Sequence, residues 1–380
     1  MHVLYLNYHL DHDLRSTDQL LERYYTMTEW CIALKRTGMR SVSIVQAWHA
    51  DQSFQRAGVD CHFVRPGPLP FVPAWLRPGR LHAKVRDLAP DVVHQSGHVY
   101  PISFLRAELG AETTLLWQHR GGETTRFPGM LLKRRGFNAI DGFLFSAKEL
   151  AASSIPSGMI KEHQRIYEIM GGSARSAPLE QKQAQKEIGL SGSPIFLWVG
   201  RLNANKDPST VLKGFARTIK THPEAHLYMI YHDSSLLFPV RALISDFHLE
   251  SNVHLVGRIE SSEMVRYYSA ADYLLLGSHR EGTGFAVLEA LACGVAPIIT
   301  DIPSFRRLTH GGTVGALWEP GDDSALSSAI ERTLLAKPSR SLVRKYFLRH
   351  WSFDALAQQA VGVYDDAYRH RNSLLIKRAS

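Results

Sequence analysis

Short runs of apolar residues, separated by helical patterns, recur along the whole chain. In the first half these runs predict strands at Val3–Leu6, Val42–Val45, Asp91–His94, Thr114–Trp117 and Gly142–Ser146. The longest helical pattern between them runs from Leu20 to Arg36 and stops at Thr37-Gly38, a common helix end. Strands that alternate with helices at this spacing are typical of a parallel sheet with crossover helices, a doubly wound α/β domain.

The second half repeats this alternation after a stretch of small residues at 171–178. Its predicted strands are Ile195–Val199, His226–Ile230, Val253–Val256, Tyr273–Leu276 and Ala296–Thr300. We therefore expect two Rossmann-like domains, over residues 1–178 and 179–350, followed by a C-terminal helix over 351–380. Ligands of doubly wound domains bind outside the carboxyl ends of the strands, so the active site is expected in the cleft between the two domains.

Charge and composition narrow the class of protein. The 380 residues carry a formal net charge of +8, divided equally between residues 1–180 and 181–380. No basic arm and no nucleic-acid-binding signature accompany that charge, so a nucleic-acid partner is not expected. The three cysteines, Cys31, Cys61 and Cys293, are too far apart for a metal or redox pair and indicate a reducing compartment. Without a basic leader or a run of about 20 apolar residues, the protein is expected in the cytoplasm.

Two cations follow the predicted strand Ile195–Val199. Arg201 and Lys206 stand five residues apart after Gly200, and Asp207-Pro208 then opens a helix. Two long basic side chains at the carboxyl end of a strand can converge on a diphosphate and take the place of a metal ion. The alternative is that both are solvated cations on a surface loop.

A glycine loop and two carboxylates follow the predicted strand Tyr273–Leu276. Gly282 and Gly284 allow close approach of a ligand to the backbone, and the helix that begins at Phe285 offers its N-terminus to an anion. Glu281 precedes this helix and Glu289 lies one turn inside it, where each can accept hydrogen bonds from a vicinal diol. The alternative is that Glu281 only caps the helix dipole and Glu289 is solvated.

Taken together, these two elements and the sequence between them resemble the donor-binding domain of the family-4 retaining glycosyltransferases, the glycosyl transferases group 1 of GT-B architecture. The resemblance covers residues 196–330. Besides Gly200-Arg201-Leu202 with Lys206 and the Glu281–Glu289 spacing, it rests on Asn252 to Gly257, Tyr268 to Asp272, Glu289 to Pro297 and Trp318 to Asp322.

The resemblance implies roles for particular residues. Arg201 and Lys206 would hold the nucleotide diphosphate, and Glu289 would hold the ribose hydroxyls. Arg258 would face the base. The donor sugar would be held by Glu281 and the backbone of Gly282, Thr283, Gly284 and Phe285. In the first domain, Trp117-Gln118-His119 places His119 where the family carries a histidine near the reacting centre, which makes His119, Glu281, Arg201 and Lys206 the expected catalytic residues.

The implied activity is transfer of a hexose, with retention, from a nucleotide diphosphate sugar to a hydroxyl acceptor. Uridine diphosphate is the expected carrier, and neither a metal nor a cofactor is expected. The expected acceptor is a glycan, a lipid-linked glycan or a precursor of an envelope polysaccharide, with peripheral contact at the inner face of the membrane. Because residues 7–12 lack the family's usual glycine-rich loop, a noncatalytic nucleotide-sugar-binding partner subunit stays an alternative, as does an epimerase of the same fold.

Overall fold

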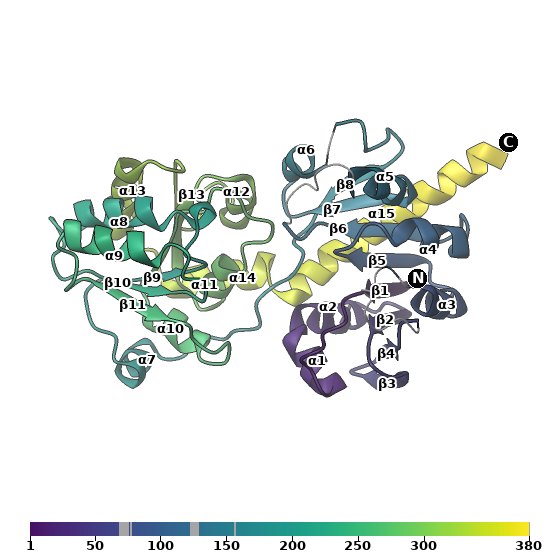
Figure 1. The fold of residues 1–380 in the computed structure, drawn as a ribbon, viewed down its shortest axis with the longest axis horizontal. Coiled ribbons are helices and arrows are strands. Elements are labelled where there is room, and N and C mark those ends of the chain that lie inside the picture. Colours follow the sequence, from purple (N-terminus) through teal and green to yellow (C-terminus); the bar gives the residue numbers. More distant parts are fainter. Residues whose placement is uncertain (68–75, 77, 122–128, 156, 380) are drawn as a thin grey trace. The chain divides into compact units, whose positions relative to one another are not determined.

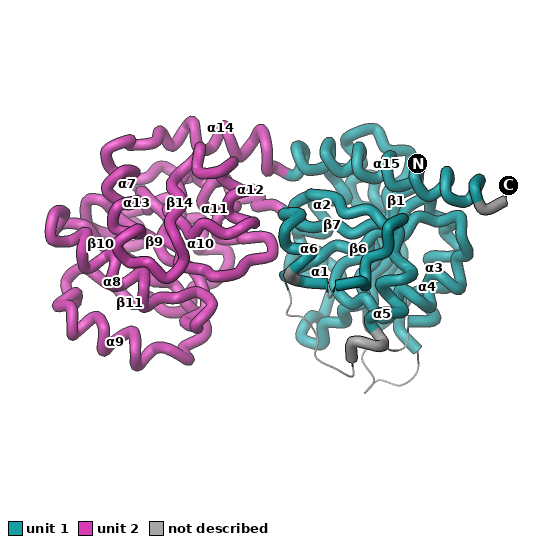
Figure 2. Tube along the Cα trace, turned by 90° about the horizontal axis from the view of Figure 1, so that it is seen from above, with its two compact units in different colours: residues 1–172, 353–380 teal, residues 173–352 magenta. Residues whose placement is uncertain are grey.

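The computed structural model describes residues 1–67, 76, 78–121, 129–155 and 157–379, which form two compact units (Figures 1 and 2). Unit 1 contains residues 1–172 and 353–380, and unit 2 contains residues 173–352. The segment that follows residue 172 belongs to unit 2 because the Ser173 hydroxyl donates to the Trp351 carbonyl and Arg344 donates to the Ser176 carbonyl. The division thus lies six residues before the predicted boundary at 178. Among the described helices, none has the length and apolar character to cross a bilayer.

The described part of unit 1 forms an eight-stranded sheet in the order β3-β4-β2-β1-β5-β6-β7-β8. All neighbouring strands are parallel except the β3–β4 pair. The strands are β1 His2–Asn7, β2 Ser41–Ala47, β3 Gln52–Arg56, β4 Val59–Val64, β5 Val92–Ser96, β6 Thr114–Gln118, β7 Gly142–Phe145 and β8 Arg165–Glu168. The helices are α1 Thr17–Arg23, α2 Tyr25–Arg36, α3 Gly79–Leu88, α4 Ile102–Leu109, α5 Gly129–Ala139, α6 Leu150–Ser154 and α15 Phe353–Ala379.

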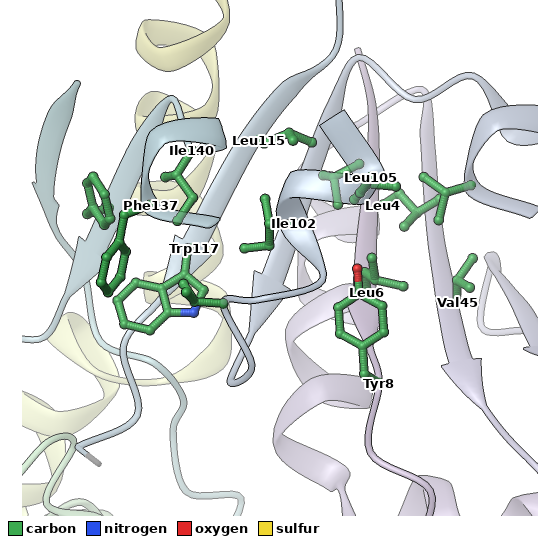
Figure 3. Packing of buried hydrophobic residues seen from close by; sticks show 14 of the residues in the cluster. Leu4, Leu6, Tyr8, Val45, Ile102, Leu105, Leu115, Trp117, Phe137 and Ile140 are labelled. Carbon is green, nitrogen blue, oxygen red and sulfur yellow. The ribbon is translucent and has the colours of Figure 1, made fainter. Parts of the chain in front are cut away.

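One apolar core lies between this sheet and helices α3 to α5 (Figure 3). Leu4 and Leu6 alternate along β1 toward that core, as a strand with a period of two requires. Trp117 of β6 packs edge-on against Phe137 of α5, with 5.9 Å between the ring centroids. The core therefore fixes the end of β6, where His119 follows.

The C-terminal helix α15 packs on unit 1, as predicted. The side chains that repeat along one face of it are buried: Leu356, Ala360, Tyr364 and Ala367. The Tyr364 hydroxyl accepts a hydrogen bond from Trp30 of α2 at 3.1 Å and lies 2.7 Å from Nδ1 of His94 on β5. Burial lowers the pKa of His94 to about 3, so this imidazole is neutral in its contact with the Tyr364 hydroxyl.

Unit 2 has a six-stranded parallel sheet in the order β11-β10-β9-β12-β13-β14. Its strands are β9 Ile195–Val199, β10 His226–Ile230, β11 Val253–Gly257, β12 Tyr273–Leu276, β13 Ala296–Thr300 and β14 Ala316–Trp318. Its helices are α7 Gln181–Ile188, α8 Pro208–Thr218, α9 Leu237–Asp246, α10 Met264–Ala270, α11 Phe285–Ala292, α12 Pro303–Thr309, α13 Asp323–Ala336 and α14 Arg340–His350. The two doubly wound sheets, parallel except for the β3–β4 pair, confirm the predicted α/β class.

The single helix predicted from Leu20 to Arg36 is wrong, because the chain forms α1 and α2 with a break at Tyr24. Tyr24 has ψ 37°, outside the helical range, and its hydroxyl donates to Asp11 at 2.8 Å. The apolar pattern continues across the break, since Leu20 and Leu21 of α1 are buried like the apolar residues of α2.

Candidate active site

The chain reverses direction within the sheet of unit 2 between β9 and β12. From β9 it proceeds outward to β10 and β11, then returns to the other side of β9 for β12, β13 and β14. The loops that follow β9 and β12 therefore meet at one point on the carboxyl edge of the sheet. Crevices of this kind are the usual ligand sites of doubly wound folds, and both predicted motifs lie there.

The loop after β9 folds back on the strand end at Gly200. A Cβ atom on Gly200 would lie 3.3 Å from Cδ of Lys206 and 3.2 Å from the Trp198 ring, tighter than most real contacts. The absence of a side chain thus lets the Lys206 stem pass over the strand end. The Asn203 carboxamide accepts a hydrogen bond from the Lys206 N–H at 3.1 Å and caps the 3₁₀ turn Ala204–Lys206. The position of the Lys206 side chain is therefore set by its own loop.

Asn205 joins the two loops through the backbone. Its carbonyl accepts from the His279 N–H at 2.8 Å, and its side-chain amide donates to the Arg280 carbonyl at 3.0 Å. Gly277 permits this approach, because a Cβ there would lie 3.0 Å from the Asp207 carbonyl oxygen.

Asp207 makes a second connection. It caps α8 by accepting from the Thr210 N–H at 3.1 Å, and its Oδ2 lies 3.1 Å from Nε2 of His279. From the sequence, Asp207 was predicted only to begin a helix, and Asn205 was assigned no role. A helix-start pattern reveals a capping carboxylate, but nothing local reveals its partner on another loop.

Lys206 and Glu281 form an ion pair between the two loops. Their side chains are 14% and 17% exposed, so water screens this pair less than a surface pair. The structure thus joins the residue predicted to hold the diphosphate to the residue predicted to hold the donor sugar. The ammonium has three donor hydrogens, so it can bind phosphate oxygens without giving up Glu281.

The second predicted carboxylate, Glu289, lies on α11 and accepts a hydrogen bond from the buried Tyr268 hydroxyl at 2.8 Å. Burial raises the pKa of Glu289 above the usual range of a glutamate, and the Tyr268 hydrogen bond offsets only part of this shift. Tyr268 was part of the motif in sequence, but its contact with Glu289 was not predicted.

The backbone of the glycine loop leads into the first turn of α11. Gly284 has φ 71° and begins the helix, and no side chain caps that turn. A Cβ on Gly284 would also lie 3.0 Å from both Phe305 and Leu308. Thr283 is buried, while Gly282 and Phe285 are half-buried. The N–H groups at the start of α11 are thus presented at the carboxyl edge of the sheet, where an anion can accept from them.

The two predicted arginines of this edge are exposed. Arg201 follows Gly200 directly. The Ser235 N–H, the Ser235 hydroxyl and the nearby Arg201 hold the pKa of Asp233 below its usual range, which places Arg201 beside the loop after β10. Arg258 follows Gly257 at the end of β11, two strands away from β9. Arg201 therefore lies near the reversal of the chain, and Arg258 lies farther along the same edge.

His119 belongs to unit 1, at the carboxyl end of β6. Its ring is buried, with 5.0 Å between its centroid and that of Phe145 and 5.9 Å to that of Trp117. The backbone N–H of His119 donates to the Leu144 carbonyl at 2.9 Å. His119 is therefore held between two aromatic rings, at the strand end where the sequence placed it.

Within the described ranges, no three His, Cys, Asp or Glu side chains lie close enough together to hold an ion. At the carboxyl edge of the unit 2 sheet, Lys206 pairs with Glu281, and Nε2 of His279 lies 3.1 Å from Oδ2 of Asp207.

We expect Glu289→Gln to separate stability from nucleotide binding. Because folding raises the pKa of Glu289, the native protein binds the carboxyl proton of Glu289 more tightly than the unfolded chain does. Ionisation of Glu289 therefore lowers the free energy of unfolding as the pH rises above the ordinary pKa of a glutamate. The glutamine amide removes that cost and its oxygen still accepts a hydrogen bond from Tyr268, so the free energy of unfolding at pH 7 should be unchanged or higher.

The affinity of Glu289→Gln for a nucleoside diphosphate should fall about 10- to 100-fold through loss of a charged hydrogen bond. Urea unfolding and calorimetric titration measure the two effects; a fall in stability at pH 7 with unchanged affinity would contradict both.

Known proteins resemble this chain in part of its sequence and in its fold. The family model of the glycosyl transferases group 1 matches residues 180–347, almost the whole of unit 2. A D-inositol 3-phosphate glycosyltransferase from Acidothermus cellulolyticus is 26% identical over 214 residues, 53% of this chain and 47% of that protein. The chain spans about half the length of the first two curated relatives that it matches.

Solved structures agree over nearly the full length. Sucrose-phosphate synthase from Thermosynechococcus elongatus is 16% identical, with a TM-score of 0.67 over 97% of this chain and 100% of that chain. HepE from Anabaena, solved in complex with UDP, is 14% identical, with a TM-score of 0.67 over 96% and 100% of the two chains. These likenesses show the GT-B fold. The protein has that fold, and its residues 180–347 match the family model of the glycosyl transferases group 1.

Proposed function

We propose that the protein is a retaining, metal-independent glycosyltransferase that moves a hexose from a nucleotide diphosphate sugar to a hydroxyl acceptor. The observation that carries this proposal is the Lys206–Glu281 pair at the reversal of the chain in unit 2, next to the uncapped start of α11. This ion pair places a cation for a diphosphate directly beside a carboxylate for sugar hydroxyls. The match of residues 180–347 to the family model of the glycosyl transferases group 1 supports the same activity.

The reaction builds negative charge on the departing diphosphate. As the bond from the sugar C1 to the diphosphate oxygen breaks, Lys206, Arg201 and the first N–H groups of α11 stabilise that charge from fixed positions. Preorganised donors of this kind usually supply the largest single catalytic effect. The acceptor oxygen forms the new bond to C1 on the same face of the sugar, and its proton passes to the leaving diphosphate.

The remaining side chains set the orientation of the donor. Glu289 receives the ribose hydroxyls through the carboxylate oxygen that does not bind Tyr268, and Glu281 receives hydroxyls of the hexose. We propose uridine diphosphate as the carrier, since HepE, which shares the fold, was solved with UDP. Unit 1, with His119, is proposed to bind the acceptor, a glycan or a lipid-linked glycan at the cytoplasmic face of the membrane.

Thermal unfolding with nucleotides tests this assignment. UDP, GDP and ADP are added separately to the full chain, each with and without a chelator, and the shift in Tm is measured. Selective stabilisation by UDP that survives the chelator is expected, by about 2.7 kcal/mol at 100 times Kd. Arg201→Ala should weaken it, whereas Lys213→Ala, which removes an exposed cation on α8, should not. No shift with any of the three, or a shift that requires metal, would overturn the proposal.

A further inference from the structure

Helix α14 lies within a strongly basic segment of the chain. Residues 332–353 contain six lysines and arginines and no aspartate or glutamate, in a chain whose formal net charge is +8. The acidic residues that flank this segment are engaged elsewhere. Glu331 lies 3.1 Å from Nε2 of His222, and Asp354 pairs with Arg36. The positive charge of the segment is therefore not balanced by its neighbours in sequence.

The inner side of α14 fixes the helix on unit 2. Arg340 donates to the Cys293 carbonyl at 3.1 Å, and Arg344 donates to the Ala292 carbonyl. Both acceptors lie at the C-terminal end of α11, where free carbonyls form the negative end of the helix dipole. A Cβ on Gly294 would lie 2.6 Å from the Arg340 carbonyl oxygen, so the two helices meet closely. These two arginines are thus used inside unit 2 and hold α14 in place.

The outer side of α14 combines leucines with cations. Leu342 and Leu348 are 65% and 49% exposed, and Lys345 and Arg349 are exposed as well. The last three follow Leu342 by three, six and seven residues, so all four lie on one face of the helix. Figure 2 shows α14 along the outside of unit 2. We name Leu342, Lys345, Leu348 and Arg349 the α14 basic face.

The cations of the α14 basic face keep their charge for a partner. Across the part of the chain that the structure describes, no carboxylate pairs with Lys345 or Arg349. Surface cations of this protein elsewhere do find such partners, as Arg165 does with Asp366. The α14 basic face therefore presents apolar surface and unbalanced positive charge together.

The groups around the C-terminal end of α14 are basic too. The His310 ring, at the end of α12, packs edge-on against the His350 ring with 4.8 Å between their centroids. The Arg307 guanidinium lies 5.3 Å from the centre of the Trp351 ring. Burial, and after it His310, Arg349 and Arg307, lower the pKa of His350. The positive charge thus extends from α14 to the end of α12.

We propose that the α14 basic face binds the surface of a bilayer that contains anionic lipids. Lys345 and Arg349 meet lipid phosphates at the level of the head groups. Leu342 and Leu348 enter the apolar layer just beneath, which is the arrangement of an amphipathic helix that lies in the interface. The leucines favour a bilayer over a nucleic acid, because a nucleic acid offers negative charge but no apolar layer. The α14 basic face takes no part in the proposed sugar transfer, so this inference does not depend on that activity.

Cosedimentation of the full chain with vesicles tests this inference. One set of vesicles is phosphatidylcholine alone, and the other contains about one third phosphatidylglycerol, whose head group is anionic. The parent should bind the anionic vesicles and not the neutral ones, and added salt should weaken this binding. Lys345→Gln combined with Arg349→Gln should weaken binding to the anionic vesicles about 10- to 30-fold, roughly a factor of five for each cation removed.

Two further double variants control this result. Lys213→Gln with Lys220→Gln removes two exposed cations on and just after α8, so it is matched in charge and should bind like the parent. Leu342→Ser with Leu348→Ser keeps every charge and should weaken binding at least several-fold. All of these side chains are exposed, and thermal unfolding verifies that each variant is folded.

Three results would overturn the inference. The first is no binding of the parent to anionic vesicles, and the second is equal binding by the Lys345→Gln, Arg349→Gln variant and its charge-matched control. The third is parent-like binding by the Leu342→Ser, Leu348→Ser variant, which would indicate attraction of charge alone, as for an acidic protein. Failure of the proposed function is recognised separately, as a Tm that UDP does not shift in the parent, and it leaves vesicle binding unaffected.

Discussion

Replacing Asp141 by alanine is expected to destabilise unit 1 by about 3–5 kcal/mol, because it leaves two buried arginines without a counter-charge. Asp141 Oδ2 pairs with Arg106 and also accepts from the Leu115 N–H at 2.8 Å. Its Oδ1 lies 3.1 Å from Nη1 of Arg371, which comes from α15. The Asp141 and Arg371 side chains are each 10% exposed, and that of Arg106 is 18% exposed. One carboxylate thus holds the C-terminal helix and α4 to the sheet.

Denaturant unfolding of the full chain measures this effect. The matched control is Asp366→Asn, which removes an α15 carboxylate paired with Arg165, both about half exposed. An exposed pair of this kind contributes about 0–1 kcal/mol, so the control should stay close to the parent. A loss below about 1 kcal/mol in Asp141→Ala would mean that backbone carbonyls alone satisfy the arginines, as Arg106 also donates to the Thr113 and Ala139 carbonyls.

Buried parallel strands were readable from sequence because burial on both faces makes them continuous apolar runs, such as Ile195–Val199. Two of the missed strands, β3 and β14, lack that signal. β3 is Gln-Ser-Phe-Gln-Arg and largely exposed, and it pairs only with β4, through a turn at Ala57-Gly58 where both residues have positive φ. β14 is three residues long and half-buried. Such edge strands are defined by their partner rather than by their own pattern.

The candidate site was predictable as two loops but not as a set of contacts. Strand ends, glycines and the spacing of Glu281 and Glu289 are local features of the sequence. The Lys206–Glu281 pair and the bonds from Asn205 to the loop after β12 join residues more than 70 positions apart. They depend on β9 and β12 being neighbours in the sheet, which no local pattern states.

Replacing Lys206 by alanine is expected to lower kcat for sugar transfer by about 10²–10³-fold, the loss typical of removing one preorganised donor to developing charge. The side chain has that effect only if it is held in position, and two features hold it: its stem packs over Gly200 and its ammonium pairs with Glu281. Arg201 is exposed and less constrained, so Arg201→Ala should cost less than Lys206→Ala. Steady-state kinetics with a nucleotide sugar measure both variants, and thermal unfolding verifies that each is folded.

Lys206→Ala also leaves the half-buried Glu281 carboxylate without its cation, and this unpaired negative charge can by itself repel a diphosphate. The double variant Lys206→Ala with Glu281→Gln separates the two causes, because it removes the unpaired charge as well. If Lys206 stabilises the leaving diphosphate directly, the double variant stays at least as slow as Lys206→Ala. Recovery to near the rate of Glu281→Gln alone would show instead that Lys206 serves only to neutralise Glu281. In that outcome Arg201 would be the cation that meets the leaving diphosphate. In a Glu281→Gln background, Arg201→Ala would then lower kcat more than Lys206→Ala does.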